Sequence, residues 1–483
     1  MNVLKGLTPA PVFRHFEAIC SIPHGSGNTR AVSDYCADFA RSLGLRFRQD
    51  EHNNIIIWKN GTPGYEDAAP VMIQGHLDMV CEKDADCPID MAAEGLRLRL
   101  EDGILSAEGT TLGGDDGIAV AYGLALLEST DLPHPPLEVV FTVDEEIGML
   151  GADALDMSDL RSRILLNVDS EQEGELLVSC AGGLLALCRI PVERERVEGM
   201  GFTLELSGCI GGHSGAEINK GSANASVLLG RCLYRLSREL PLALVSAEGG
   251  EKDNAIPRAA CAALVLREGG DRAALEAAVK ELENTLRAEY AVTDPELSLR
   301  LREREIDVPA LTQESARRVL TALRNLPNGV QRMSPSVPGM VQTSLNLGIL
   351  LTSEAEVTLE YCVRSSEESE KWALTDQIVC LTEMLGGSVE VSGNYPGWAY
   401  REDSPLRDTM VAVYERMYGE KPLVRGMHAG VECGLFDSRL PGLDCVSFGP
   451  DMEDIHTPRE RLSVESARRT WEYLVEVLKE LKY

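Results

Sequence analysis

Apolar residues in the first part of the chain follow two different periodicities. At 10–20 and 30–43 they recur at helical spacing, which predicts two amphipathic helices, and 116–128 predicts a third that begins at a carboxylate able to cap it. Short continuous apolar runs predict buried strands at 54–58, 71–74, 137–143 and 164–168. Strands that alternate with helices indicate a mostly parallel α/β sheet.

The pattern changes near residue 188. Alternating strands are predicted at 202–207, 261–266, 297–302, 346–350 and 356–363, with helices at 222–240, 272–290, 313–326 and 368–385. After residue 396 the first pattern returns, with a strand at 444–449 and a helix at 464–481 whose apolar stripe is expected to cover a sheet face. We therefore expect one discontinuous domain, 1–187 and 396–483, interrupted by an inserted two-lobed α+β lid domain, 188–395.

Composition narrows the class of protein. The formal net charge of −31, from 77 acidic and 46 basic residues, disfavours nucleic acids and membranes as partners because it repels phosphates and anionic lipids. None of the 13 cysteines forms a CxxC pair, and an odd, scattered set is typical of a reducing compartment. The first residues contain no apolar stretch typical of a signal peptide, and no apolar run approaches the roughly 20 residues of a membrane span. These features predict a cytoplasmic protein.

Acidic and imidazole side chains follow the predicted strands. They come after the apolar runs at 71–74, 137–143, 164–168 and 444–449, and comprise His76, Asp78, Glu145, Glu146, Asp169 and His456. Asp115 lies in a glycine-rich turn that opens the helix at 116–128. Because ligands bind at the carboxyl ends of the strands in an open α/β sheet, we expect these side chains to meet at one edge.

The donor set predicts the kind of ligand. Two imidazoles with several carboxylates suit zinc, manganese or cobalt better than calcium or magnesium, which take oxygen ligands. Five protein ligands exceed the needs of one catalytic zinc and fit two metals about 3.5–4 Å apart that share a bridging carboxylate. Each motif alone has a simpler explanation, such as a polar pair, a solvated charge run or a helix cap. Their shared position after predicted strands favours the metal site.

Eight segments resemble the dinuclear zinc peptidases that include carnosinases and bacterial dipeptidases. The resemblance runs from about Thr8 to the C-terminus, and in chain order the segments read GHLDMV, TTLGGDDGIAVA, FTVDEEIGMLGA, LLNVDSEQEGE, GGHSGAEI, NAIPR, HAGVECGLF and IHTPRERL. The resemblance implies a catalytic domain with a lid domain, and hydrolysis of Xaa-Xaa dipeptides, including Xaa-His. It also implies two Zn²⁺ ions, which Co²⁺ or Mn²⁺ could replace.

The resemblance also implies a role for each matching residue. His76 and Asp169 would hold one zinc, Glu146 and His456 the other, with Asp115 as the bridge and a cis peptide between Asp115 and Asp116. Asp78 would orient His76, and Glu145 would be the general base. In the lid, His213 would stabilise the oxyanion, and the substrate would be held by Asn254, Arg364 and Gly430. Relatives with long lids include monomers and dimers, so a homodimer through the lid stays open.

Other functions are also compatible with parts of the sequence. A deacylase or an aminopeptidase could use the same metal core, and a non-catalytic metal-binding protein could keep the fold. A serine hydrolase would need its nucleophile in a Gly-x-Ser-x-Gly turn after a strand, which the sequence around Ser214 does not provide. We therefore expect a metallo-dipeptidase, with the deacylase or aminopeptidase as the alternative.

Overall fold

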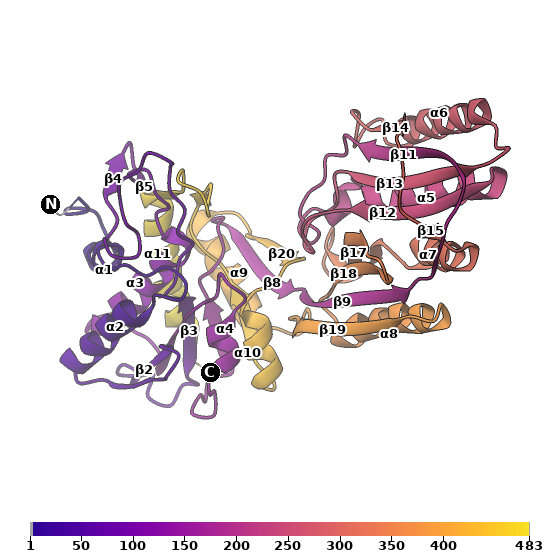
Figure 1. Cartoon of the computed structure of the whole chain (residues 1–483). Coiled ribbons are helices and arrows are strands. Elements are labelled where there is room, and N and C mark those ends of the chain that lie inside the picture. The colour runs from indigo at the N-terminus through magenta and orange to yellow at the C-terminus, as the bar shows by residue number, and fades with distance from the viewer. Residues whose placement is uncertain (1–2, 483) are drawn as a thin grey trace. The chain divides into compact units, whose positions relative to one another are not determined.

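The computed structural model describes residues 3–482, which form two compact units. Within the described residues, unit 1 comprises 3–179, 398–426 and 431–482, and unit 2 comprises 180–397 and 427–430. Each unit has its own hydrophobic core. Figure 1 shows the elements of both.

Unit 1 is built on an eight-stranded mixed sheet in the order β1-β2-β6-β3-β7-β21-β8-β20. The strands are β1 (Arg46–Gln49), β2 (Ile55–Lys59), β3 (Val71–His76), β6 (Leu137–Thr142), β7 (Ile164–Asn167), β8 (Glu175–Cys180), β20 (Leu423–Met427) and β21 (Asp444–Ser447). The central strands β6, β3, β7 and β21 are parallel, whereas β1, β2 and β8 pair antiparallel. Every residue of β3 and β6 is buried, as expected for central strands covered on both faces.

Helices cover this sheet. They are α1 (Ala10–Cys20), α2 (Arg30–Ser42), α3 (Gly114–Glu128), α4 (Leu150–Ala154), α9 (Pro405–Tyr418), α10 (Cys433–Arg439) and α11 (Val464–Glu480). Almost all of α3 is buried because it is apolar on every side; it packs on β3, and α1 packs on α3 (Figure 1). The predicted apolar stripe of α11, from Trp471 to Leu481, is buried in the same core.

A second, four-stranded sheet in unit 1 has the order β22-β23-β5-β4. It consists of β4 (Leu98–Glu101), β5 (Ile104–Ala107), β22 (Met452–Glu453) and β23 (Arg461–Ser463). Two segments that are far apart in the sequence therefore lie side by side, with Leu105 of β5 paired to Leu462 of β23.

Unit 2 contains one larger sheet in the order β14-β11-β13-β12-β17-β18-β9-β19, and β16 pairs with β17. Its strands are β9 (Gly182–Pro191), β11 (Gly199–Ser207), β12 (Leu242–Gly249), β13 (Ala260–Arg267), β14 (Ser298–Glu303), β16 (Gly329–Met333), β17 (Val341–Thr352), β18 (Glu356–Ser365) and β19 (Ser388–Tyr395). A separate ribbon pairs β10 (Arg194–Glu195) with β15 (Ala310–Leu311). The two halves of the large sheet meet where Gly249 of β12 pairs with Leu350 of β17.

Alternation along β13 shows how the unit 2 sheet is covered. Ala262, Leu264 and Leu266 belong to the core shared with α5 (Ala225–Glu239), α6 (Arg272–Glu289), α7 (Gln313–Asn325) and α8 (Glu368–Met384). The intervening residues Ala263 and Val265 belong to a smaller cluster with Ala310 of β15. Because successive side chains of a strand point to opposite faces, the helices cover one face and the β10–β15 ribbon lies on the other.

Core packing between α1 and α3 yields a stability prediction. Phe16 is completely buried, and its ring faces Gly117 of α3. We expect Phe16→Ala to lower the free energy of unfolding by about 3–5 kcal/mol, because it leaves a cavity that the helices cannot close. Urea denaturation measures this loss. Leu43→Ala, at a side chain that is 40% exposed, should change stability by less than about 0.5 kcal/mol; equal effects would contradict the packing argument.

Candidate metal centre

The five side chains predicted to bind metal converge at one edge of the unit 1 sheet. His76 ends β3, Asp115 lies in the first turn of α3, Glu146 follows β6, Asp169 follows β7, and His456 lies between β22 and β23. Groups drawn from this edge have ligand atoms within 4.8 Å of one another, among them Asp115 with Glu146 and His456. The residues span most of the chain, and the fold brings them together.

Asp115 lies between two imidazoles. Its Oδ1 is 3.0 Å from Nε2 of His76, and its Oδ2 is 3.2 Å from Nε2 of His456. A second carboxylate faces each ring: Asp169 Oδ1 lies 3.7 Å from His76 Nε2, and Glu146 Oε1 lies 2.9 Å from His456 Nε2. The site thus consists of two imidazole–carboxylate groups that share one aspartate.

The close carboxylates shift the pKa values of the groups in this site. Burial, helped by the charges of Asp115 and Glu146, raises the pKa of Asp169 to about 6. Hydrogen bonds to Asp115 and then Glu146 raise the pKa of His456 to about 10. Burial alone would lower the pKa of His76, but hydrogen bonds to the surrounding carboxylates, Asp115 first, raise it well above its usual value. The site therefore favours positive charge among its carboxylates.

The donor set fits a pair of divalent transition-metal ions. Imidazole nitrogens and carboxylate oxygens face common points, and a carboxylate with one oxygen toward each ring has the arrangement of a bridge. A bound cation would also offset the repulsion among Asp169, Asp115 and Glu146, whose charges add to burial in raising the pKa of Asp169. The two imidazoles among the donors, His76 and His456, match zinc, cobalt or manganese better than calcium, which takes oxygen ligands.

Asp78 lies behind the site, almost fully buried. Its Oδ1 is 3.5 Å from Nδ1 of His76, and the same ring nitrogen is 2.9 Å from the Asp78 carbonyl oxygen. The Asp78 carboxylate also accepts hydrogen bonds from Ser26 Oγ and from the backbone N–H groups of Glu145 and Glu146. One buried side chain thus fixes the His76 ring and the loop that carries both glutamates.

Glu145 differs from Glu146 in its surroundings. Within residues 3–482 its carboxylate makes no hydrogen bond or ion pair, although it lies within 4.8 Å of ligand atoms of His76 and Glu146. Burial raises the pKa of Glu145 well above its usual value, and the charges of Asp169 and Glu432 act in the same direction. A half-buried carboxylate with a raised pKa beside a metal site can accept a proton and release it again.

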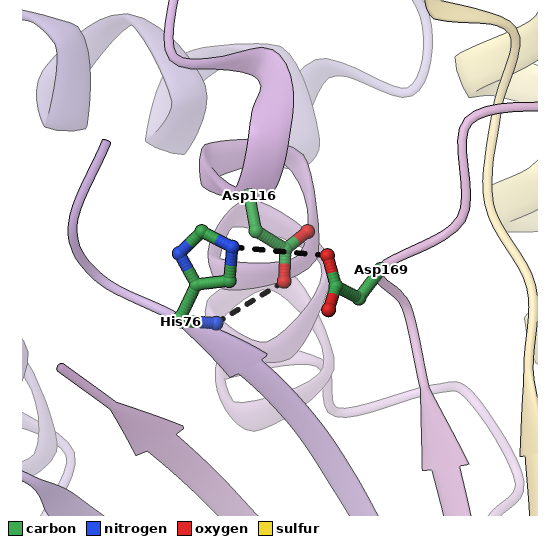
Figure 2. A group of neighbouring side chains, drawn as sticks. All are labelled: His76, Asp116 and Asp169. Atoms are coloured by element: carbon green, nitrogen blue, oxygen red, sulfur yellow. Dashed lines mark hydrogen bonds and ion pairs between the residues drawn. The ribbon is translucent and has the colours of Figure 1, made fainter. Parts of the chain in front are cut away.

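Asp116 was predicted as a helix cap and as part of a cis peptide, but its place in the site was not predicted; the helix begins at Gly114, with Gly113 as its N-cap. Its Oδ2 accepts a hydrogen bond of 3.1 Å from the backbone N–H of His76, and its carboxylate lies beside Asp169 (Figure 2). Burial and then the charge of Asp169 raise the pKa of Asp116 well above its usual value. A Cβ on Gly75 would lie 2.5 Å from Asp116 Oδ2, so glycine is needed for this approach. The peptide between Asp115 and Asp116 is cis, as the resemblance implied.

Two further carboxylates also escaped the sequence reasoning. Glu432 is completely buried, accepts hydrogen bonds from Gln74 in β3 and from Thr142 at the end of β6, and has its pKa raised to about 7 by burial. Glu460 accepts hydrogen bonds from the backbone of the loop before α3. Neither follows a predicted strand directly, which was the signal used to find the other acids.

In unit 2, His213 has a defined tautomer. Its Nδ1 accepts hydrogen bonds from the backbone N–H groups of Gly215 and Ala216, at 3.1 and 3.0 Å. Burial and then the charge of Arg364 lower the pKa of His213, so the ring is neutral near pH 7. A neutral ring whose Nδ1 accepts carries its proton on Nε2 and can donate that proton to an oxyanion.

Arg364, in β18, lies close to His213. A Cβ on Gly215 would be 3.2 Å from Arg364 Nε and 3.0 Å from His213 Cε1. Arg364 is 7% exposed and donates a hydrogen bond of 2.9 Å from Nη1 to the Tyr395 hydroxyl. The backbone carbonyl of Asn254 accepts a hydrogen bond from Ser214, next to His213. Unit 2 therefore brings His213, Arg364 and the Asn254 backbone into one neighbourhood.

Gly430 lies in the short segment 427–430, which groups with unit 2 although its flanks belong to unit 1. The adjacent Ala429 accepts a hydrogen bond from the backbone N–H of Ala181. Two residues before Gly430, Nε2 of His428 lies 2.7 Å from Ser344 Oγ in β17. These contacts hold the segment against the strands of unit 2.

Residues 72–480 match peptidase family M20/M25/M40, and the chain therefore belongs to this family of peptidases. Over 484 residues it is 37% identical to the cytosol non-specific dipeptidase of Escherichia coli (strain K12), and the match covers 100% of this chain and 99% of that protein. The predicted resemblance to a peptidase family that includes dipeptidases is thus confirmed.

Solved structures agree with this assignment. The crystal structure of aminoacylhistidine dipeptidase from Vibrio alginolyticus matches with a TM-score of 0.94 and 37% identity, covering 99% of this chain and 98% of that one. The aminopeptidase PepT from Bacillus cereus ATCC 10987 matches with a TM-score of 0.56 at 15% identity over 99% of this chain and 100% of that chain, which shows a shared fold alone. The predicted α/β fold with an inserted α+β part is confirmed.

Proposed function

We propose that the chain is a metal-dependent dipeptidase that hydrolyses Xaa-Xaa dipeptides, including Xaa-His. The observation that carries this proposal is the Asp115 carboxylate, which has one oxygen toward each of two imidazoles, next to Glu145, which has no ion-pair partner among the described residues. The names of the relatives from Escherichia coli and Vibrio alginolyticus support the dipeptide as substrate.

The distances support the ligands that the resemblance implies. His76 and Asp169 would hold one ion, Glu146 and His456 would hold the other, and Asp115 would bridge them. We propose zinc at both positions, with Co²⁺ or Mn²⁺ as replacements. When bound, the pair would polarise the substrate carbonyl and lower the pKa of water toward about 7.

Glu145 would move the protons. Its carboxylate would accept a proton from the attacking water and deliver it to the nitrogen of the leaving amine. Asp78 would keep Glu145 in place by accepting its backbone N–H at 3.1 Å, and would hold the orientation of the His76 ring. The peptide bond is thereby exchanged for a carboxylate and an amine.

Unit 2 would act as the lid domain and bind the substrate. His213 would donate from Nε2 to the oxygen that becomes negative, and the Arg364 guanidinium would bind the free carboxylate of the dipeptide through two N–H groups. Asn254 and Gly430 would contribute further polar contacts. These residues would come from the same chain or, in a homodimer joined through unit 2, from a second copy; a monomeric mass in solution would exclude the second copy.

The substrate class is tested with a panel. The purified protein, loaded with Zn²⁺, is assayed on dipeptides that include Xaa-His, on tripeptides, and on N-acetyl amino acids. We expect dipeptides to be cleaved with the highest kcat/KM. Preferred cleavage of N-acetyl amino acids would instead indicate a deacylase, and preferred cleavage of tripeptides would indicate an aminopeptidase; either result would contradict the proposal.

Arg364→Lys tests the carboxylate contact. Lysine keeps the charge but cannot bind two carboxylate oxygens in a fork, so we expect kcat/KM for a dipeptide to fall about 10- to 100-fold. The same dipeptide with an amidated C-terminus should lose much less, because it lacks the carboxylate. Arg332→Lys, at a side chain that is 54% exposed, is the matched control. Equal losses on both substrates would assign Arg364 another role.

The location of the protein belongs to the same proposal. None of the helices within residues 3–482 combines the length and the apolarity that a bilayer span requires. We propose the cytoplasm, which is supported by the name of the relative from Escherichia coli.

A further inference from the structure

The Glu460 carboxylate is surrounded by backbone donors. Its Oε2 accepts hydrogen bonds from the N–H groups of Leu112 and Gly113, at 2.7 and 3.1 Å. Its Oε1 accepts from those of Gly114 and Asp115, at 2.8 and 3.4 Å. Four successive N–H groups thus point at one side chain, which is 3% exposed.

The loop is shaped to receive this carboxylate. Gly113 has a φ of +68°, in the left-handed region that favours glycine, and this turn brings the N–H groups on both sides of it to the same point. A Cβ on Gly114 would lie 3.2 Å from Glu460 Oε1, so the side chain sits directly on the backbone. Hydrogen bonds from N–H groups to a buried carboxylate are stronger than those between neutral groups.

The two parts that Glu460 joins each carry one side of the metal centre. The loop of residues 112–115 ends at Asp115, which faces both imidazoles. Glu460 lies on the segment between β22 and β23 that also carries His456, and its own N–H donates to the carbonyl of Thr457 at 3.1 Å. The small sheet brings these segments together only as far as β5 and β23, where Leu105 pairs with Leu462.

We infer that Glu460 is a positioning residue that fixes Asp115 relative to His456 and thereby sets the geometry of the metal pair. Beyond β5 the loop of residues 112–115 is held by Glu460 through every one of its N–H groups. A shift of this loop would move the Asp115 carboxylate away from one imidazole while leaving each ligand present. The inference rests on the proposed function, because it concerns the same pair of ions.

Glu460→Gln is the decisive variant. The amide keeps the size of the side chain but replaces one acceptor oxygen by an NH₂ group, which would face N–H donors. Bound metal is removed from the full-length protein, which is then titrated with Co²⁺. Calorimetry measures the affinity for each ion, and electron paramagnetic resonance measures the magnetic coupling between two Co²⁺ ions that share a carboxylate. Glu465→Gln, at a side chain that is 67% exposed and five residues away, is the matched control.

We expect the wild type and Glu465→Gln to bind two coupled Co²⁺ ions. In Glu460→Gln we expect the weaker-binding Co²⁺ to lose at least about tenfold in affinity and the coupling to disappear. We also expect kcat for a dipeptide to fall more than KM rises. The urea midpoint of the metal-free protein should change little. If Glu460→Gln does not fold, Glu460→Asp, which keeps the charge on a shorter side chain, should show the same losses.

Two results would overturn the inference. One is a variant with wild-type affinities and intact coupling. The other is a metal-free protein that is strongly destabilised while its folded fraction binds both ions normally, which would mean that Glu460 only supports the fold. A wild type that binds fewer than two Co²⁺ ions or cleaves no dipeptide would refute the proposed function, and the inference with it; failure confined to the variant refutes the inference alone.

Discussion

Glu145→Gln should lower kcat for dipeptide hydrolysis by about 10²- to 10⁴-fold while the metal content stays that of the wild type. The glutamine side chain has nearly the same size but cannot accept a proton from water. Burial raises the pKa of Glu145, so the carboxylate holds a proton more firmly than an exposed glutamate and can return it to the leaving amine.

This prediction also separates a base from a ligand. Glu145 lies near His76 and Glu146, so the distances alone would allow it to bind metal. Metal analysis by mass spectrometry, run beside the kinetics, decides between the two roles: loss of an ion from Glu145→Gln would make it a ligand, and near wild-type turnover would remove it from the mechanism. Glu94→Gln, at a side chain that is 52% exposed, controls for the lost charge.

Removal of the metal should have the second large effect. We expect a chelator to reduce turnover below detection and stoichiometric Zn²⁺ to restore it, because the metal pair would polarise the substrate carbonyl and activate the attacking water. Metal that binds the folded state but not the unfolded chain also stabilises the fold, by about 2.7 kcal/mol per site when the free metal concentration is about 100 times Kd. Thermal unfolding with and without chelator measures this difference.

Asp115→Ala separates loss of the bridge from loss of metal in general. We expect this variant to bind fewer than one tightly held ion per protein molecule and to stay inactive when Zn²⁺ is added back. Both imidazoles lose the carboxylate that they share. The chelated wild type must recover under the same conditions for the comparison to hold. Full turnover in chelator, or in Asp115→Ala with Zn²⁺, would show that the reaction does not depend on this centre.

Much of the fold is visible in the hydrophobic pattern. The predicted helix at 10–20 coincides with α1, and those at 272–290 and 313–326 end one residue beyond α6 and α7. The strands β8, β9 and β12 were not predicted. β12 follows α5 after a connection of only two residues, Leu240 and Pro241, and the proline marks the end of the helix but does not show that a strand begins directly after it.

The candidate site was likewise predicted only in part from the sequence. His76 and Asp169 were found because each stands at the end of an apolar run, and parallel strands bring such positions to one edge. Glu460 could not be found by that rule, because its partners are backbone N–H groups more than 340 positions away in the sequence. Its role depends on the shape of the loop of residues 112–115, which is a property of the folded chain.

The interrupted course of unit 1 has a consequence for synthesis on the ribosome. In its sheet, β21 lies between β7 and β8, although all of unit 2 is translated before it. The nascent chain must therefore keep a gap beside β7 until residue 444 has emerged, and His456 and Glu460 follow later still. Unit 2 can fold first, and any chain terminated before residue 456 would leave the ribosome with an incomplete metal centre.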